Sequence, residues 1–227
     1  MFERLKKVFG RSDKTIDSPV TADAVSRWAG SQGFSYTGYG DNPAFAVTGK
    51  IGDKPWKLER GPSTRDYIRG EELRARAELK VNDDAAVLVM NRPLKEALEK
   101  RAYEMYTDTL QTIADPSLPE EMRWLAMYPE VGWDGLPPAF WKRYSVLADR
   151  REHALGWLDS NLAELLMSWP EPAPDEKIPF MLMLLRGKAY LRMQYTPANM
   201  PALKHATQIF TSACESAVTG LETDVVL

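Results

Sequence analysis

The chain has 227 residues, of which 44% are hydrophobic and 27% charged, and its formal net charge is −3. A chain of this length buries roughly 70% of the surface that its unfolded form exposes, so it needs neither a disulfide nor a metal to fold. The acidic balance excludes a general nucleic-acid binder, which carries a strong basic excess. The single cysteine, Cys214, excludes an internal disulfide, and no secretory signal is expected, so we predict a cytoplasmic protein.

Residues 1–14 form a short basic segment, with five basic and two acidic residues and hence a local net charge of +3. Its apolar residues recur at helical spacing, but so short a helix needs a partner surface to be stable. An anionic membrane would provide one, because aromatic and aliphatic side chains enter the interface while lysines meet the headgroups. The predicted membrane contacts are Met1, Phe2, Leu5, Lys6, Lys7, Val8 and Phe9. The alternative is that Phe2 and Phe9 pack on the body of the protein.

These residues resemble the basic amphipathic starts of some peripheral bacterial membrane proteins, such as the secretion motor ATPase. The resemblance implies contact with the inner face of a membrane.

The first α+β half is predicted over residues 19–107. Its strongest signal is the strict alternation of apolar and polar residues through Glu71–Val81, which a strand with one buried face requires. Ala85–Met90 is apolar on both faces and is expected inside a sheet, paired with the first strand through a turn at Asn82-Asp83-Asp84. The other predicted elements are a helix from Ala22 capped by Thr21, strands 34–37, 45–51 and 56–60, and a helix 93–106.

Residues 108–141 form a connector rich in proline and aromatic residues. Ser117–Glu120 has the pattern of a capping box, which predicts a short helix ending near Met127. A connector this aromatic is expected to be buried or to form a binding surface. The partner-binding candidates are Trp124, Tyr128, Trp133 and Trp141, since large aromatic residues dominate binding hot spots. The alternative is that these rings form a core that joins the two halves.

The second α+β half is predicted over residues 142–221, followed by a tail, 222–227. Its expected elements are a strand 143–148, a helix 152–169, a hairpin of strands 179–185 and 188–195 turning at Arg186-Gly187, and a helix 198–221. The fold class is therefore α+β: antiparallel sheet covered by helices, in two similar halves with separate sheets or one shared sheet. This order of elements resembles the small α/β fold of type III secretion chaperones, which implies partner binding.

The sequence contains only incomplete versions of the motifs that bind a metal, bind phosphate or place two catalytic carboxylates together. Asp149 and His153 lie at i and i+4 on an expected helix, but no further histidine completes a metal site. Thr48-Gly49-Lys50 lacks the earlier glycine of a phosphate loop. Neighbouring carboxylates such as Glu71 and Glu72 are interpreted as surface charge, because neighbours on a strand point to opposite faces. We predict no metal site and no cofactor.

The loop Ser63–Gly70 is the best-placed polar binding segment, with Arg65, Tyr67 and Arg69 available. It lies in a region where arginines and carboxylates alternate, so mutual ion pairs are expected to neutralise most of the charge.

The sequence favours a non-catalytic interaction protein, an adaptor or chaperone-like module of the cytoplasm that also contacts the inner face of a membrane. Its expected partner is another protein, and nucleic acid is not expected. One alternative is an enzyme whose active site is assembled from residues far apart in the sequence. The first candidates for that site are Arg65, Tyr67, Glu72 and His153. Another is a self-associating structural protein, and the oligomeric state stays open.

Overall fold

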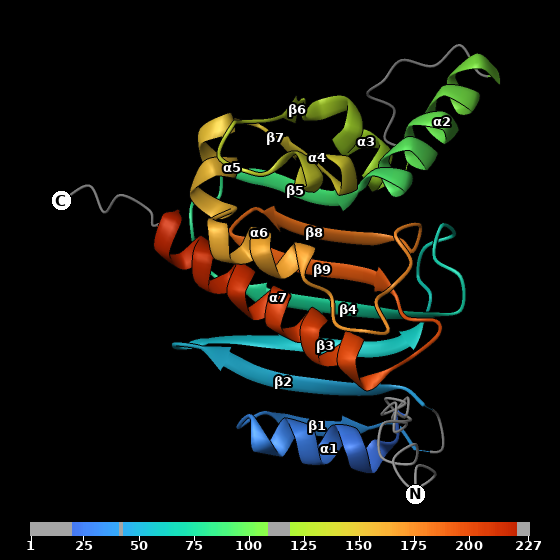
Figure 1. Ribbon diagram of the computed structural model, residues 1–227, viewed down its shortest axis with the longest axis vertical. Coiled ribbons are helices and arrows are strands. Elements are labelled where there is room, and N and C mark those ends of the chain that lie inside the picture. Colours follow the sequence, from blue (N-terminus) through green and yellow to red (C-terminus); the bar gives the residue numbers. More distant parts are fainter. Residues whose placement is uncertain (1–19, 41–42, 109–118, 222–227) are drawn as a thin grey trace, which may run out of the picture.

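The computed structural model describes residues 20–40, 43–108 and 119–221 (Figure 1). Within these ranges nine strands form one antiparallel sheet in the order β1-β2-β3-β4-β9-β8-β5-β7-β6. The strands are β1 (Ser35–Gly38), β2 (Phe45–Ile51), β3 (Lys54–Pro62), β4 (Glu71–Glu78), β5 (Ala86–Asn91), β6 (Glu130–Val131), β7 (Tyr144–Ala148), β8 (Phe180–Leu185) and β9 (Lys188–Gln194). Strands from before and after the connector therefore share one sheet, and the α+β fold class is confirmed.

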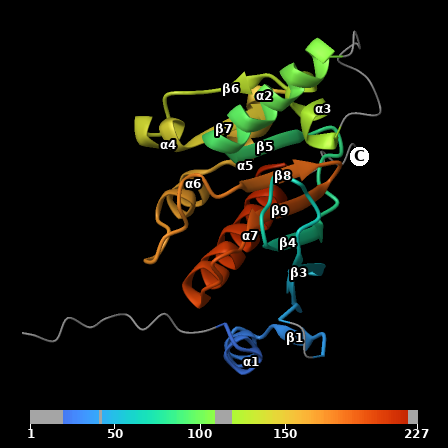
Figure 2. The ribbon, with the colours of Figure 1, turned by 90° about the vertical axis from the view of Figure 1, so that its right-hand side faces the viewer.

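Helices cover both faces of this sheet. They are α1 (Ala22–Ser31), α2 (Arg92–Asp108), α3 (Glu120–Met127), α4 (Pro138–Arg143), α5 (Arg151–Trp157), α6 (Ser160–Met167) and α7 (Met200–Gly220). Figure 1 shows α5, α6 and α7 in front of the sheet, where they and α1 contribute to the larger apolar core. Figure 2 shows α7 and α3 on opposite sides, and α2 and α3 complete a smaller core there.

Two neighbouring rows of side chains across the sheet show how its faces differ. The row on the larger core contains Leu58, Ala75, Leu191, Leu182 and Val89, all buried. The next row, on the opposite face, contains Lys57, Arg76, Tyr190, Met183 and Leu88. We call this second face the groove face. The residues on the groove face are charged where it is open and apolar where α2 and α3 cover it. This follows because apolar side chains are stabilised when they are removed from water.

The predicted pairing of Glu71–Val81 with Ala85–Met90 is wrong. β4 pairs with β3 and β9, and β5 pairs with β7 and β8, so the β8–β9 hairpin lies between them. Three strand spacings separate β4 from β5, about 14 Å, which the intervening seven residues span easily. All six residues of β5 are buried, which confirms that this strand lies inside the sheet.

The β8–β9 hairpin itself is confirmed. Leu185 pairs with Lys188, and the two turn residues, Arg186 and Gly187, have φ angles of 52° and 68°. Positive φ at both turn positions is the geometry of a type I′ turn, whose twist matches that of the flanking strands.

The helix predicted over 152–169 is two helices. α5 ends at Trp157, and α6 begins after Asp159, whose carboxylate accepts a hydrogen bond from the backbone N–H of Leu162 at 2.7 Å. Asp159 also accepts a hydrogen bond from Ser216 of α7 at 2.7 Å, so the break fixes the second helix against α7. The other predicted helices are confirmed in position, including the Thr21 cap of α1.

Three predictions fall outside the described residues: the amphipathic segment 1–14, the tail 222–227 and the capping role of Ser117. The short helix expected near Met127 is present as α3, which follows Pro119. Among the helices within the described ranges, none has both the length and the apolar character needed to cross a membrane.

Candidate functional site

The groove face is open over β3, β4 and β9, where a hollow of about 1040 Å³ lies; we call it the trough. Five cationic side chains and two carboxylates line it: Lys50, Lys57, Arg74, Arg76 and Arg192, with Glu59 and Glu78. Several are paired along their strands, as Lys57 is with Glu59 at 2.7 Å and Arg76 with Glu78 at 2.6 Å. Cations outnumber carboxylates among the lining side chains, although Arg74 and Arg192 also lie near the buried carboxylate of Glu72.

A second hollow, of about 440 Å³, continues from the trough; we call it the α3 groove. It shares Met183, Tyr190 and Arg192 with the trough. Its wall is α3, which contributes Trp124, and Met127 beside it is 64% exposed. The α3 groove therefore combines apolar and aromatic surface with charged groups, a composition typical of binding sites.

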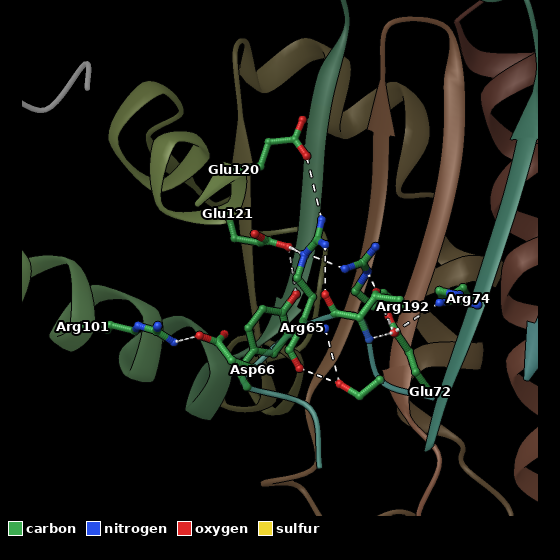
Figure 3. A network of polar contacts seen from close by, with 11 residues as sticks. Arg65, Asp66, Glu72, Arg74, Arg101, Glu120, Glu121 and Arg192 are labelled. Carbon is green, nitrogen blue, oxygen red and sulfur yellow. Dashed lines mark hydrogen bonds and ion pairs between the residues drawn. The ribbon is translucent and has the colours of Figure 1, made fainter. Parts of the chain in front are cut away.

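A network of buried charges lies beside these hollows (Figure 3). Glu72 of β4 has no exposed surface, and its Oε2 accepts hydrogen bonds from the backbone N–H and the hydroxyl of Thr64 at 2.8 and 2.9 Å. Its Oε1 lies 3.1 Å from Nε of Arg192, and Nη1 of Arg74 lies 4.0 Å from its Oε2. The interpretation of Glu72 as a surface charge is therefore wrong, because the loop after β3 and the β9 arginine cover it.

Glu121 of α3 is the second buried carboxylate of the network, with 2% of its surface exposed. Its Oε1 accepts hydrogen bonds from Nε of Arg65 and, at 3.2 Å, from the hydroxyl of Tyr67. Nη1 of Arg192 lies 3.7 Å from the same oxygen, so Arg192 bridges the two buried carboxylates. Figure 3 shows this arrangement, which ties α3 to β4, β9 and the loop before β4.

The loop 63–70 is held at both ends by hydrogen bonds. The backbone N–H of Ser63 donates to the carbonyl of Gly70 at 3.3 Å, and that of Arg69 donates to the side chain of Gln194 at 2.9 Å. Arg65 and Tyr67 point to Glu121, whereas the side chain of Arg69 is exposed. Two of the three residues predicted in this loop are thus part of the network.

The contacts within the network also shift the pKa values of Tyr67 and Arg65. Burial, followed by the negative charge of Glu121, raises the pKa of the Tyr67 phenol, so the phenol stays protonated near neutral pH. Burial alone would lower the pKa of the Arg65 guanidinium, but the hydrogen bond and charge of Glu121 raise it overall. Both groups are hydrogen-bond donors to Glu121, and this arrangement holds α3 in place.

The four aromatic candidates of the connector separate into two pairs. Trp124 and Tyr128 pack against the smaller core and line the α3 groove. Trp133 and Trp141 pack against the larger core, with their ring centroids 5.1 Å apart. The structure therefore brings only the first pair together with Arg65 and Tyr67.

The residues considered for an enzyme are brought together only in part. Arg65, Tyr67 and Glu72 belong to one network, whereas Nδ1 of His153 lies 2.9 Å from the carboxylate of Asp149. Asp149 also accepts a hydrogen bond from the backbone N–H of Ala86 at 3.0 Å, at the start of β5. No group of three or more potential metal ligands occurs among the residues that the structure describes.

Sequence reasoning missed Arg192 and the burial of Glu121. Arg192 lies on β9, 120 positions after Glu72, and becomes its neighbour only because the β8–β9 hairpin inserts beside β4. No local pattern in the sequence carries this information. The one available signal is that Arg192 is a charged residue in a strand with buried neighbours on both sides.

No protein-family model matches the chain, and no curated protein matches it either. Among solved structures, the chain is similar to the crystal structure of the mycobacterial trehalose monomycolate transport factor A, TtfA. The similarity has a TM-score of 0.49 at 13% sequence identity and covers 89% of this chain and 97% of that chain.

Proposed function

We propose that this chain is a non-catalytic, adaptor-type protein that binds a protein partner on the trough and the α3 groove. The observation that carries the proposal is a pair of adjoining hollows with shared lining residues, on the face of the sheet that the described helices leave open over β3, β4 and β9. The trough offers arginines and lysines, and the α3 groove offers Trp124, Met127 and Tyr128 beside further arginines. Aromatic anchors surrounded by charged groups are typical of protein–protein interfaces.

The distribution of charge favours a protein partner over a nucleic acid. The trough contains Glu59 and Glu78 among its cations, and these carboxylates would repel a phosphate backbone. A protein surface offers both signs of charge and can match a mixed pattern.

The buried network supports a non-catalytic role. Glu72 and Glu121 are the most buried carboxylates beside the hollow, and each is bound by hydroxyl, backbone or guanidinium donors. A general base must instead contact its substrate, and Glu72 and Glu121 have at most 2% of their surface exposed. In this arrangement the carboxylates hold α3 in the position that forms the wall of the groove.

We place this activity in the cytoplasm, at the inner face of a membrane. The basic segment 1–14 supports this location, because its lysines and aromatic residues suit an anionic lipid surface. The segment and the trough would then have separate tasks: one attaches the chain to lipid and the other holds the partner.

Photocrosslinking in cells tests the proposed function. A benzophenone amino acid replaces Tyr190 on the floor of the hollow in the full-length chain, and in a control it replaces Tyr103, which is 71% exposed on α2 and outside both hollows. We expect a discrete adduct with another protein from position 190 and none from position 103. Adducts equal at both positions, or none at position 190, would contradict the proposal. A crosslinked dimer of this chain would favour the self-associating alternative.

A further inference from the structure

Two arginines that line the α3 groove have donors without acceptors. Nε of Arg123 and Nη1 of Arg192 are buried and make no hydrogen bond within the described part of the chain. The nearest carboxylate oxygen to Nη1 of Arg192, that of Glu121, is 3.7 Å away, beyond hydrogen-bond reach. Buried donors are almost always paired in folded proteins, because an unpaired one loses its hydration without compensation. The nearby Oε1 of Glu72, 3.1 Å from Nε of Arg192, is also without a hydrogen bond, so part of the need of Arg192 can be met within the network, whereas the described residues offer no acceptor to Nε of Arg123. An anionic group bound in the groove would supply one.

The charges around the groove define that group. Neither Arg123 nor Arg186, on the β8–β9 turn, forms an ion pair within the described ranges, although both line the groove. The groove also contains Asp83 and Asp84 at the turn end and Glu120 near Arg65. Because these carboxylates would repel an extended polyanion, the group that suits the arginines is a single small anion, such as a carboxylate.

The rest of the surface in the groove is apolar. Trp124 and Met127 of α3 face the strand residues Met183 and Tyr190 across it. Met183 is buried and Met127 is exposed, so the apolar surface extends from the floor to the rim. Two methionines and two aromatic rings accommodate an aromatic or aliphatic side chain well.

We propose that the α3 groove binds an acidic, apolar peptide segment of the partner, holding an aspartate or glutamate carboxylate between Arg123 and Arg192. A neighbouring apolar side chain of the same segment packs on Trp124, Met127 and Tyr190. This inference rests on the proposed function and names the chemistry of the partner. The arginine side chains turn their unpaired donors to the carboxylate, which restores the hydrogen bonds that they lack.

The shape of the site favours a peptide over a lipid surface. The α3 groove is a recess of about 440 Å³ between a helix and a sheet, with the buried Met183 in its floor. A peptide side chain enters such a recess, whereas the surface of a bilayer meets only its rim. Charge and apolar contact from one short segment are a recurring mode of peptide recognition.

Selection from a random-peptide display library on the immobilised full-length protein tests the inference. We expect selected peptides to contain Asp or Glu next to Phe, Trp, Leu or Met. Arg123→Gln should lose this preference, and Lys204→Gln, which removes the same charge from the exposed surface of α7, should keep it. A preference without an acidic residue, no enrichment, or an unchanged preference in Arg123→Gln would overturn the inference.

A selected peptide then serves as a fluorescent probe. Its dissociation constant should rise at least tenfold in Arg123→Gln, stay within twofold in Lys204→Gln, and rise with salt. Unchanged thermal midpoints show that the variants are folded. If phosphatidylglycerol vesicles displace the peptide by binding to the same arginines, the occupant of the groove is lipid and the peptide proposal is overturned. If the crosslink from position 190 to a partner persists in Arg123→Gln, the inference fails while the proposed function stands.

Discussion

Glu72 is the residue on which the stability of the site depends most directly. Its carboxylate is fully buried and faces Arg192 at 3.1 Å. Replacing Glu72 with Gln keeps the shape and removes the charge, leaving the Arg192 guanidinium, whose side chain is 18% exposed, with one carboxylate in place of two. Breaking a buried pair in this way costs about 3–5 kcal/mol. We expect a decrease of this size in the free energy of unfolding, measured by urea denaturation.

Glu78 provides the control on the same strand and the same face. Its carboxylate lies 2.6 Å from Arg76 and 3.4 Å from Lys188, but its side chain is 55% exposed. Exposed pairs contribute little to stability, because water and salt screen them. Glu78→Gln should leave the urea midpoint unchanged. Equal losses in the two variants would show that burial does not determine the effect at Glu72.

His205 on α7 makes stability depend on pH. Burial lowers the pKa of this imidazole below its ordinary value of 6.5, although a hydrogen bond from Nε2 to the carbonyl of Leu165 at 2.8 Å opposes the shift. The folded state therefore favours the neutral ring. Its stabilising contribution is fully present above about pH 6.5 and is lost as the pH falls from there through the lower folded pKa.

Urea denaturation between pH 7.5 and pH 5 tests this titration. The wild-type protein should lose more stability over this range than His205→Gln, because the variant has no imidazole to protonate at this position. Other groups titrate equally in both proteins, so the difference between the two curves isolates His205. Parallel curves would contradict the assignment.

At the scale of single residues, the buried charges show what could not be predicted from the sequence. Alternation along Glu71–Val81 correctly predicts that Leu73, Ala75 and Ala77 face the core. It places Glu72 on the other face, also correctly, but it says nothing of what covers that face. Glu72 and Glu121 are buried by Thr64, Arg65 and Arg192, which come from a loop and a distant strand. Such contacts depend on topology.

At the scale of elements, α5 and α7 cross at two glycines. A Cβ atom added at Gly220 would lie 1.9 Å from the backbone oxygen of Gly156. Backbone atoms cannot move aside as a flexible side chain can, so Gly220→Ala must separate the two helices. We expect a loss of about 1–3 kcal/mol in the free energy of unfolding, the usual range for overpacking, measured by thermal or urea denaturation.

Gly30 is the matched control, since it is also a helical glycine and a Cβ there would have nothing within 4 Å. Alanine favours helix by up to about 1 kcal/mol over glycine, so Gly30→Ala should be neutral or stabilising. Destabilisation by both substitutions would point to a general effect of glycine replacement and against the close crossing at Gly220.

The helices and strands themselves were largely predictable from the sequence, whereas the pairing of the strands in the sheet was less so. Turn chemistry located the Arg186-Gly187 hairpin, and Thr21 marked the start of α1. Asp159 carried a capping signal that the apolar periodicity of 152–169 obscured, so one helix was expected in place of two. The neighbours of β4 and β5 were wrong because the β8–β9 hairpin, which comes much later in the chain, inserts between these two strands, and no local pattern around residues 71–90 indicates this.

At the scale of the whole molecule, basic residues occur in both of the proposed binding regions although the net charge is −3. One is the trough and α3 groove, which is concave and contains carboxylates. The other is the segment 1–14, with its local charge of +3. A concave surface suits a protein partner, and a short amphipathic segment suits a lipid surface. The two proposed activities should therefore be separable by mutation.

Co-sedimentation of the full-length chain with phosphatidylglycerol vesicles tests this separation. Each lysine near an anionic surface contributes about 1 kcal/mol, so the double variant Lys6→Glu/Lys7→Glu should bind at least about 30-fold more weakly than the wild type. Binding by the wild type should also weaken as salt is added. The variant Lys50→Glu/Lys204→Glu has the same net charge and should bind like the wild type, because it alters only the trough and α7. If this second variant loses binding and the first does not, the body of the protein contacts the membrane and the assignment of residues 1–14 is wrong.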